Sequence, residues 1–97
     1  MLFYESWRPR AGQGPAESEA GLAAFSRWKA PAGLEFQGFY FRADGGGFCI
    51  CETSSSEVMF EATAPWAGVY LDYEMVPIVA LEKAVELLNK GVAFRKG

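Results

Sequence analysis

The spacing of apolar residues changes several times between the period of a strand and the period of a helix. Four short segments are rich in aromatic residues or alternate apolar with polar residues, which predicts strands at residues 2–7, 34–42, 48–52 and 69–77. Three other segments repeat apolar residues at helical spacing. They predict helices at about residues 15–29, from residue 54 to a stop at Pro65 or Gly68, and at about 79–90.

Local signals support these elements. The three consecutive glycines at residues 45–47 tolerate unusual backbone angles and predict a hairpin turn between the second and third strands. Ser54 and Glu57 have the spacing of a capping box, which predicts the start of the second helix. Gly91 predicts the end of the third helix, and we expect residues 92–97 to fray.

The order of elements predicts an α+β domain over residues 1–91. The order strand, helix, strand, strand, helix, strand is the ferredoxin-like βαββαβ plan, and one C-terminal helix is added to it. We expect a four-stranded antiparallel sheet with the first and third strands at its centre. Right-handed crossovers would place both early helices on the same face, which leaves the other face bare.

Alternation within the strands divides their residues into two sets. The first set is almost wholly apolar and is expected to face the helices: Leu2, Tyr4, Leu34, Phe36, Tyr40, Phe48, Ile50, Val69, Leu71, Tyr73 and Met75. The second set is mixed and is expected on the bare face: Phe3, Glu5, Trp7, Glu35, Gln37, Phe39, Phe41, Cys49, Cys51, Tyr70, Asp72, Glu74 and Val76.

The aromatic residues of the second set would form a large apolar patch in water, so we predict a homodimer in which two such faces pack together. The predicted interface residues are Phe3, Trp7, Phe39, Phe41, Tyr70 and Val76. The alternative is a monomer whose third helix folds over the bare face.

Composition excludes several functions. The 97 residues are 51% apolar and carry a net charge of −3, so the chain suits one folded domain and lacks a basic surface for nucleic acid or acidic membranes. The absence of histidine excludes Ser-His-Asp or Cys-His catalysis and histidine-bound haem or zinc. The start carries no signal peptide pattern and no apolar run reaches about 18 residues, so we expect a reduced, cytoplasmic protein.

Several short motifs together resemble a known family. They are YESWRP near the start, KAPAGLEF before the second strand, GGGFCICET in the hairpin, Trp66 after the second helix and LDYEMVPI in the fourth strand. Over about residues 1–78 the chain resembles a family of short bacterial proteins of unknown function, a branch of the dimeric α/β-barrel superfamily.

The resemblance implies paired ferredoxin-like sheets but no single activity. The superfamily includes cofactor-free monooxygenases, lactone isomerases, polyketide cyclases, haem enzymes and ligand binders. Many family members carry Trp and His near the end of the second strand, where this chain has Phe39, Tyr40, Phe41 and Arg42. A histidine-dependent role is therefore not implied.

Carboxylates form the first candidate site. The fourth strand is expected beside the first, so Glu5 could approach Glu74 or Asp72, and two desolvated carboxylates would include one suited to general acid or base catalysis. The alternative places these groups at the interface rim, paired with Arg8, Arg10 or Arg42.

Aromatic residues form the second candidate site. Tyr4, Tyr40 and Tyr73 are expected on the helix-facing side, in a cavity closed by Trp28 and Trp66 that would suit an aromatic molecule. The alternative is that these rings only fill the core.

Cys49 and Cys51 could form a metal site, with four thiolates across a dimer axis, or a reactive thiol, but the C-x-C spacing favours small buried residues. The glycine run lacks the features of a phosphate loop. We therefore predict no metal and no cofactor.

These observations favour a homodimeric domain that binds a small aromatic or apolar molecule. Its predicted ligand-binding residues are Tyr4, Glu5, Trp28, Tyr40, Trp66, Tyr73 and Glu74. The alternatives are a cofactor-independent enzyme of the monooxygenase, isomerase or cyclase type and a structural assembly domain without a ligand.

Overall fold

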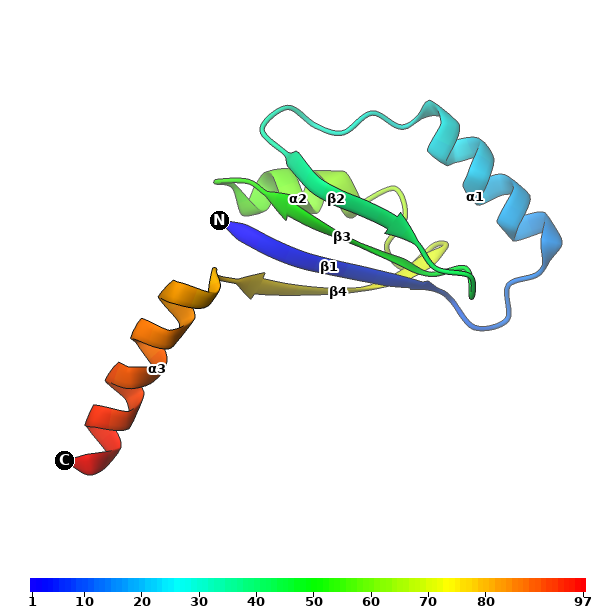
Figure 1. Cartoon of the computed structure of the whole chain (residues 1–97). Helices are drawn as coiled ribbons and strands as arrows, with labels where there is room; N and C mark the ends of the chain where they lie inside the picture. The colour runs from blue at the N-terminus through cyan, green and yellow to red at the C-terminus, as the bar shows by residue number, and fades with distance from the viewer.

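Four antiparallel strands and three helices make up the chain, as the sequence predicts (Figure 1). The computed structural model describes all 97 residues. The elements are β1 (Leu2–Pro9), α1 (Pro15–Arg27), β2 (Glu35–Phe41), β3 (Gly47–Glu52), α2 (Ser56–Thr63), β4 (Leu71–Ile78) and α3 (Leu81–Lys96).

The strands form one sheet in the order β2-β3-β1-β4. The first and third strands are central, as predicted, and the order is compatible with a ferredoxin-like arrangement. The hairpin between β2 and β3 is also confirmed. In its turn Gly45 has a φ of 90°, and Asp44 accepts a hydrogen bond from the Gly46 N–H at 3.1 Å.

The helix starts follow local hydrogen bonding. The N-cap of α2 is Ser55 and not the predicted Ser54. Its Oγ atom accepts a hydrogen bond from the Val58 N–H at 3.3 Å. Ahead of α1 the Gly14 N–H donates to the Glu17 carboxylate at 3.0 Å. Each contact satisfies one of the free N–H groups at the helix start.

The fourth strand starts later than predicted. The carbonyl oxygen of Trp66 accepts hydrogen bonds from the N–H groups of Val69, Tyr70 and Leu71, at 3.0 to 3.1 Å. Val69 and Tyr70 therefore belong to a turn between α2 and β4 and cannot pair as strand residues. The early start predicted for this strand is wrong.

Helices α1 and α2 lie on the same side of the sheet, since Phe25 of α1 contacts Phe39 of β2, and Phe39 packs against the core cluster to which α2 contributes. The buried core between the layers consists of Trp7, Leu34, Cys49, Cys51, Met59 and Ala62. We call this side of the sheet the covered face and the opposite side the open face.

The faces predicted for the residues of β4 are confirmed, but those predicted for β1, β3 and most of the aromatic residues of β2 are wrong. Directly paired residues of an antiparallel sheet share a face. On the covered face, Glu5 is opposite Cys49 and Trp7 is opposite Tyr73. The open face carries the apolar set Tyr4, Tyr40, Phe48, Ile50 and Val76 together with the polar residues Ser6, Asp72 and Glu74.

Most predicted interface residues therefore lie elsewhere. Phe3, Trp7, Phe39 and Phe41 are on the covered face, and Tyr70 is in the turn before β4. Val76 alone among the predicted interface set is on the open face.

Two features explain this error. Gly47 is paired with Trp7, and without a side chain there the indole ring lies directly over the Gly47 backbone. In β2 the pairing shifts between Phe36 and Gly38, so Phe36 and Phe39 both face the helices although they are three residues apart. Strict alternation fails in β2 for this reason.

The third helix stands apart from the rest of the molecule (Figure 1). None of its residues is buried, and it packs against no other element. It continues to Lys96, beyond the end predicted near Lys90. It leaves the open face uncovered, which contradicts the alternative in which the third helix folds over that face. No helix of the chain has the length and apolarity to cross a membrane.

Candidate functional site

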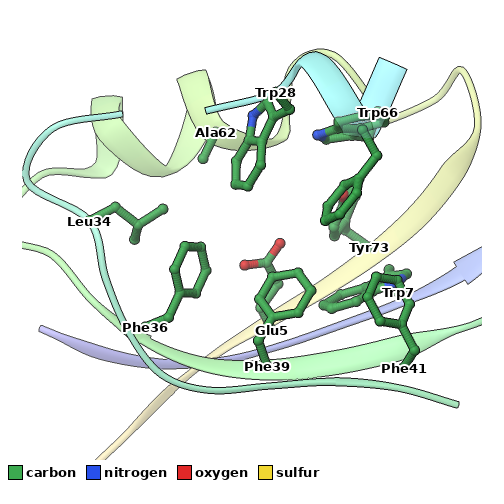
Figure 2. A pocket seen from close by; sticks show the side chains of 11 residues that line it. Glu5, Trp7, Trp28, Leu34, Phe36, Phe39, Phe41, Ala62, Trp66 and Tyr73 are labelled. Atoms are coloured by element: carbon green, nitrogen blue, oxygen red, sulfur yellow. The ribbon is translucent and has the colours of Figure 1, made fainter. Parts of the chain in front are cut away.

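A small cavity lies between the covered face and helices α1 and α2 (Figure 2). Its volume is about 60 Å³. It is lined by Glu5, Trp7, Phe25, Trp28, Leu34, Phe36, Phe39, Phe41, Ala62, Trp66 and Tyr73. Glu5 is the one charged residue among these, so the cavity is an aromatic enclosure around a single carboxyl group.

Side chains from the helix layer close the cavity. The ring of Phe25 lies 5.9 Å from that of Trp66 and 6.4 Å from that of Phe39. Trp28 lies 6.4 Å from both Trp66 and Phe36. Helix α1 has no buried residue, so it covers the cavity mainly through Phe25 and the adjoining Trp28.

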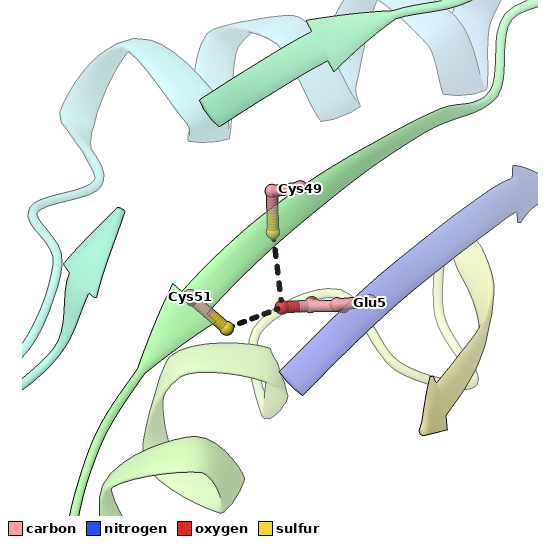
Figure 3. Close-up of side chains that lie close together, drawn as sticks. All are labelled: Glu5, Cys49 and Cys51. Atoms are coloured by element: carbon pink, nitrogen blue, oxygen red, sulfur yellow. Dashed lines mark hydrogen bonds between the residues drawn. The ribbon is translucent and has the colours of Figure 1, made fainter. Parts of the chain in front are cut away.

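Glu5 lies at the sheet side of the cavity and is only 6% exposed. Its Oε2 atom accepts hydrogen bonds from the thiols of Cys49 at 3.4 Å and Cys51 at 3.9 Å (Figure 3). Its other oxygen, Oε1, has no hydrogen-bond partner in the chain. Every fully buried side-chain oxygen of the structure has a partner, so Oε1 is not fully buried. Oε1 therefore retains access to the cavity, where a bound molecule could meet it.

Burial dominates the electrostatics of this site. It raises the pKa of Glu5 above its ordinary value, and the two thiol hydrogen bonds oppose this only in part. Burial, followed by the nearby Glu5 charge, also raises the pKa of Cys49, Cys51 and Tyr73. Both thiols and the Tyr73 hydroxyl consequently stay protonated at neutral pH.

The same three residues bring metal-ligand atoms together. The Glu5 carboxylate oxygen and the sulfur atoms of Cys49 and Cys51 all lie within 4.8 Å of one another. Both cysteines are free and buried. This is a set of donors to which a thiophilic cation could bind.

Residues 1–92 match the family described as a domain of unknown function, DUF3303. The chain belongs to this family. No curated protein and no solved structure matches the chain. The family resemblance inferred from the motifs is thus shown as membership of DUF3303, a family whose description assigns no activity.

In this DUF3303 chain the cavity unites only part of the predicted ligand site. Glu5, Trp28, Trp66 and Tyr73 all line it. Tyr4, Tyr40 and Glu74 lie on the open face, since Tyr4 pairs with Val76, Tyr40 with Phe48 and Glu74 with Ser6. The expectation that three tyrosines share one cavity is therefore wrong.

The predicted carboxylate pair is also absent. Glu5 is opposite Met75 and points to the covered face, whereas Glu74 and Asp72 lie on the open face of the same strand pair. Asp72 instead approaches Arg10, with 3.6 Å between its Oδ1 atom and Arg10 Nε. Glu5 is consequently the single carboxylate of the DUF3303 cavity.

Sequence analysis missed several residues of the site. Phe25 and Leu34 received no ligand role, and Trp7, Phe39 and Phe41 were assigned to a dimer interface. The three-residue spacing of Phe25 and Trp28 was the available signal for the roof. Nothing in the sequence revealed the shift in β2 that turns Phe39 and Phe41 toward the helices.

A second, polar hollow of about 350 Å³ lies on the open-face side near the β2–β3 turn. Arg8, Arg42, Asp44 and Glu74 are among its lining residues. Arg42 and Asp44 already form an ion pair at 2.7 Å. Because its charges have both signs and one pair is matched internally, this hollow selects no particular ligand charge.

Proposed function

We propose that this chain forms a homodimeric domain that binds a small aromatic molecule in the cavity around Glu5. The observation that supports this most is the single carboxyl group in an otherwise apolar, aromatic-walled site. Binding sites for small molecules are typically apolar enclosures with a few polar groups that set orientation. Here that group is the free Oε1 atom of Glu5.

The proposed ligand is an aromatic ring that carries one O–H or N–H donor. The ring would pack between Trp28, Trp66 and Phe36, and the donor would meet Oε1. A buried acceptor prefers a partner with a donor, because an unmatched polar group costs about 1–3 kcal/mol. An aromatic molecule without a donor should bind more weakly for this reason.

Ligand entry requires helix α1 to move outward. The cavity of about 60 Å³ is smaller than the ~150 Å³ cavity that holds a benzene-sized molecule. Helix α1 buries none of its residues, so outward movement would expose little fully buried surface. Phe25 and Trp28 then act as a movable roof.

Phenol and toluene provide a matched pair of probes, since they have nearly the same size and differ by one hydroxyl group. All three tryptophans of the chain line the cavity, so intrinsic fluorescence reports on its occupancy. We expect saturable fluorescence changes with phenol and weaker binding of toluene. Glu5→Leu should abolish the preference for phenol.

The control for this experiment is Phe60→Ala, which removes an aromatic ring that is 78% exposed on α2 and outside the cavity. It should leave phenol binding unchanged. Equal binding of phenol and toluene by the unmodified chain would contradict the role of Glu5. Conversion of the bound molecule, rather than reversible binding, would favour the alternative of a cofactor-independent enzyme.

Homodimer formation is the second part of the proposal, and it rests on two apolar surfaces left without a partner. On the open face the ring of Phe48 lies 5.9 Å from Tyr4 and 5.3 Å from Tyr40, and Tyr40 is 58% exposed. On α3 the residues Leu81, Val85 and Leu88 form an exposed stripe. Within one chain α3 projects away from the sheet, so neither surface covers the other (Figure 1).

The shape of the chain supports the same idea. Its radius of gyration is 16.8 Å, against roughly 13 Å for a compact domain of this length, because α3 projects from the body. We infer that the open faces of two copies pack together and that each α3 lies across the partner. The pairing of the two sheets is what the resemblance to the dimeric α/β-barrel superfamily implies.

Light scattering after size-exclusion chromatography tests the dimer. The expected mass is twice that of the 10.6 kDa chain. Leu88→Glu should shift the population to monomers without unfolding the body, because α3 lies outside it. Phe94→Glu makes the same change on another side of α3 and should leave the dimer intact; a monomeric unmodified chain would contradict the proposal.

A further inference from the structure

We propose that Glu5, Cys49 and Cys51 form a binding site for one zinc ion at the floor of the aromatic cavity. The two cysteines alone favoured simple packing, because C-x-C offers only two ligands. The register of the sheet adds the third. Glu5 is paired directly with Cys49, and Cys51 is the next residue of β3 on the same face.

The spacing of the donor atoms suits a tetrahedral ion. Zinc bonds of about 2.3 Å to sulfur and 2.1 Å to oxygen place the two ligand atoms roughly 3.6 Å apart at the tetrahedral angle. The observed distances from Glu5 Oε2 are 3.4 Å to Cys49 Sγ and 3.9 Å to Cys51 Sγ (Figure 3). An ion between these atoms would need only small side-chain movements.

The scaffold of the site is rigid. Its ligands come from β1 and β3, the two central strands, and all three residues are buried. Ligands held on paired central strands lose little freedom when a metal binds. Helix α2 packs over the site on the covered face, where Met59 Sδ lies 3.9 Å from Cys51 Sγ.

The fourth position of the ion would face the aromatic cavity. A site with three protein ligands and one open position is the arrangement of catalytic zinc sites, whereas structural sites use four protein ligands. The cavity of about 60 Å³ has room for a water molecule as fourth ligand. The ion would thus be accessible to a small molecule that enters beneath α1.

Binding changes the protonation of the site in a defined way. Without metal both cysteines are neutral thiols that donate to the Glu5 carboxylate. Zinc requires thiolates, so each ion bound would displace the two thiol protons, which pass to the buffer. Two thiolates, one carboxylate and one divalent ion leave a net charge of −1 on the site.

The test uses metal alone on the full chain, purified under reducing conditions and freed of metal with a chelator. We expect one zinc ion per chain by elemental analysis, release of protons on zinc addition and a higher midpoint of thermal unfolding with zinc. Cobalt should give the near-ultraviolet charge-transfer absorption of thiolate ligands.

Cys49→Ser, Cys51→Ser and Glu5→Gln should each lower zinc affinity by more than ~100-fold, because even residues that only orient metal ligands contribute about 10- to 100-fold. Met59→Leu conserves volume beside the cluster and should retain zinc. Circular dichroism without metal verifies that each variant is folded.

Two results would overturn the zinc site: absence of thiolate-to-cobalt absorption in the folded chain, or equal loss of zinc in Met59→Leu and Cys51→Ser. The zinc site does not depend on the proposed aromatic ligand. The phenol experiment is done with chelator present, so failure of one proposal leaves the other intact.

Discussion

Both faces of the sheet carry aromatic rings, more of them on the covered face, and the two groups lie in opposite environments. On the covered face Trp7 is 7% exposed and contacts the rings of Phe39, Phe41 and Tyr73. On the open face the only aromatic ring near Tyr40 is that of Phe48, and Tyr40 is 58% exposed. The same residue types therefore form a core on one side and an unpartnered surface on the other.

The difference shows that aromatic content alone does not identify a core. Most rings on the covered face also meet side chains from the helix layer and so lose much of their contact with water, although Phe41 at the edge stays 64% exposed. Rings on the open face meet only their neighbours in the sheet. The energetic value of an aromatic residue depends on this second layer, because the hydrophobic effect scales with the area removed from water.

The largest expected contrast is between Trp7→Ala and Tyr40→Ala. Loss of the buried indole should destabilise the chain by about 3–5 kcal/mol, because it leaves a cavity in the core. Loss of the exposed tyrosine should cost no more than about 0.5 kcal/mol in a dilute monomer. Urea unfolding measures the free energy of unfolding of both variants. Equal losses would mean that the covered and open faces do not differ in burial.

Protein concentration sharpens this comparison. If the open faces pair in a homodimer, Tyr40→Ala should become more costly as concentration rises, whereas the effect of Trp7→Ala should change less.

The next contrast is between Gly47→Ala and Gly38→Ala. A methyl group at Gly47 would overlap the Trp7 indole and lie 2.6 Å from the Tyr40 carbonyl oxygen, so we expect a loss of about 1–3 kcal/mol. At Gly38 the methyl would meet the Tyr40 ring at 2.9 Å, and that exposed side chain can move aside. The same urea experiment should show a much smaller loss for Gly38→Ala.

A third contrast concerns the carboxylates. Burial raises the folded-state pKa of Glu5, so the folded chain binds this proton more tightly than the unfolded chain. Stability should therefore be highest below the ordinary pKa and fall as pH rises toward the folded-state value. Each tenfold change in proton affinity corresponds to about 1.4 kcal/mol.

Glu5→Gln in metal-free buffer removes this pH dependence and should be more stable than the unmodified chain above that pH range. Thermal unfolding at several pH values checks both statements. The opposite result would be an unmodified chain whose free energy of unfolding rises steadily from pH 4 to pH 7, together with a Glu5→Gln variant that lacks this rise. That result would contradict the burial of an ionisable Glu5.

The smallest effect is expected at Asp72 on the open face. Its ion pair with Arg10 is 3.6 Å long and both side chains are about half exposed, so solvent screens it. Asp72→Asn should change the free energy of unfolding by about 0.5 kcal/mol or less. A larger loss would show that the open face is shielded from water, as in a dimer.

Much of the fold could be predicted from local sequence signals. The glycine run at residues 45–47 allows the turn that joins β2 to β3, and the spacing of Leu81, Val85 and Leu88 is typical of the helix found there. The site was harder to predict. Glu5 and Trp28 were recognised as candidates, but Phe39 was placed on the wrong face because no local signal marks the shift in β2.

The amino-acid sequence by itself determined the order of the elements, the hairpin and the alternation of side chains within β1, β3 and β4, because these follow from interactions between near neighbours in the chain. Only the tertiary structure decided which residues of each strand share the covered face, and these come from both predicted sets. That choice depends on how the Trp7 ring fits over Gly47, on the shifted pairing of β2 and on the side chains of α1 and α2, which are distant in sequence. The meeting of Glu5 with Cys49 and Cys51 follows from the same strand register, so the candidate site emerges only when the sheet is assembled.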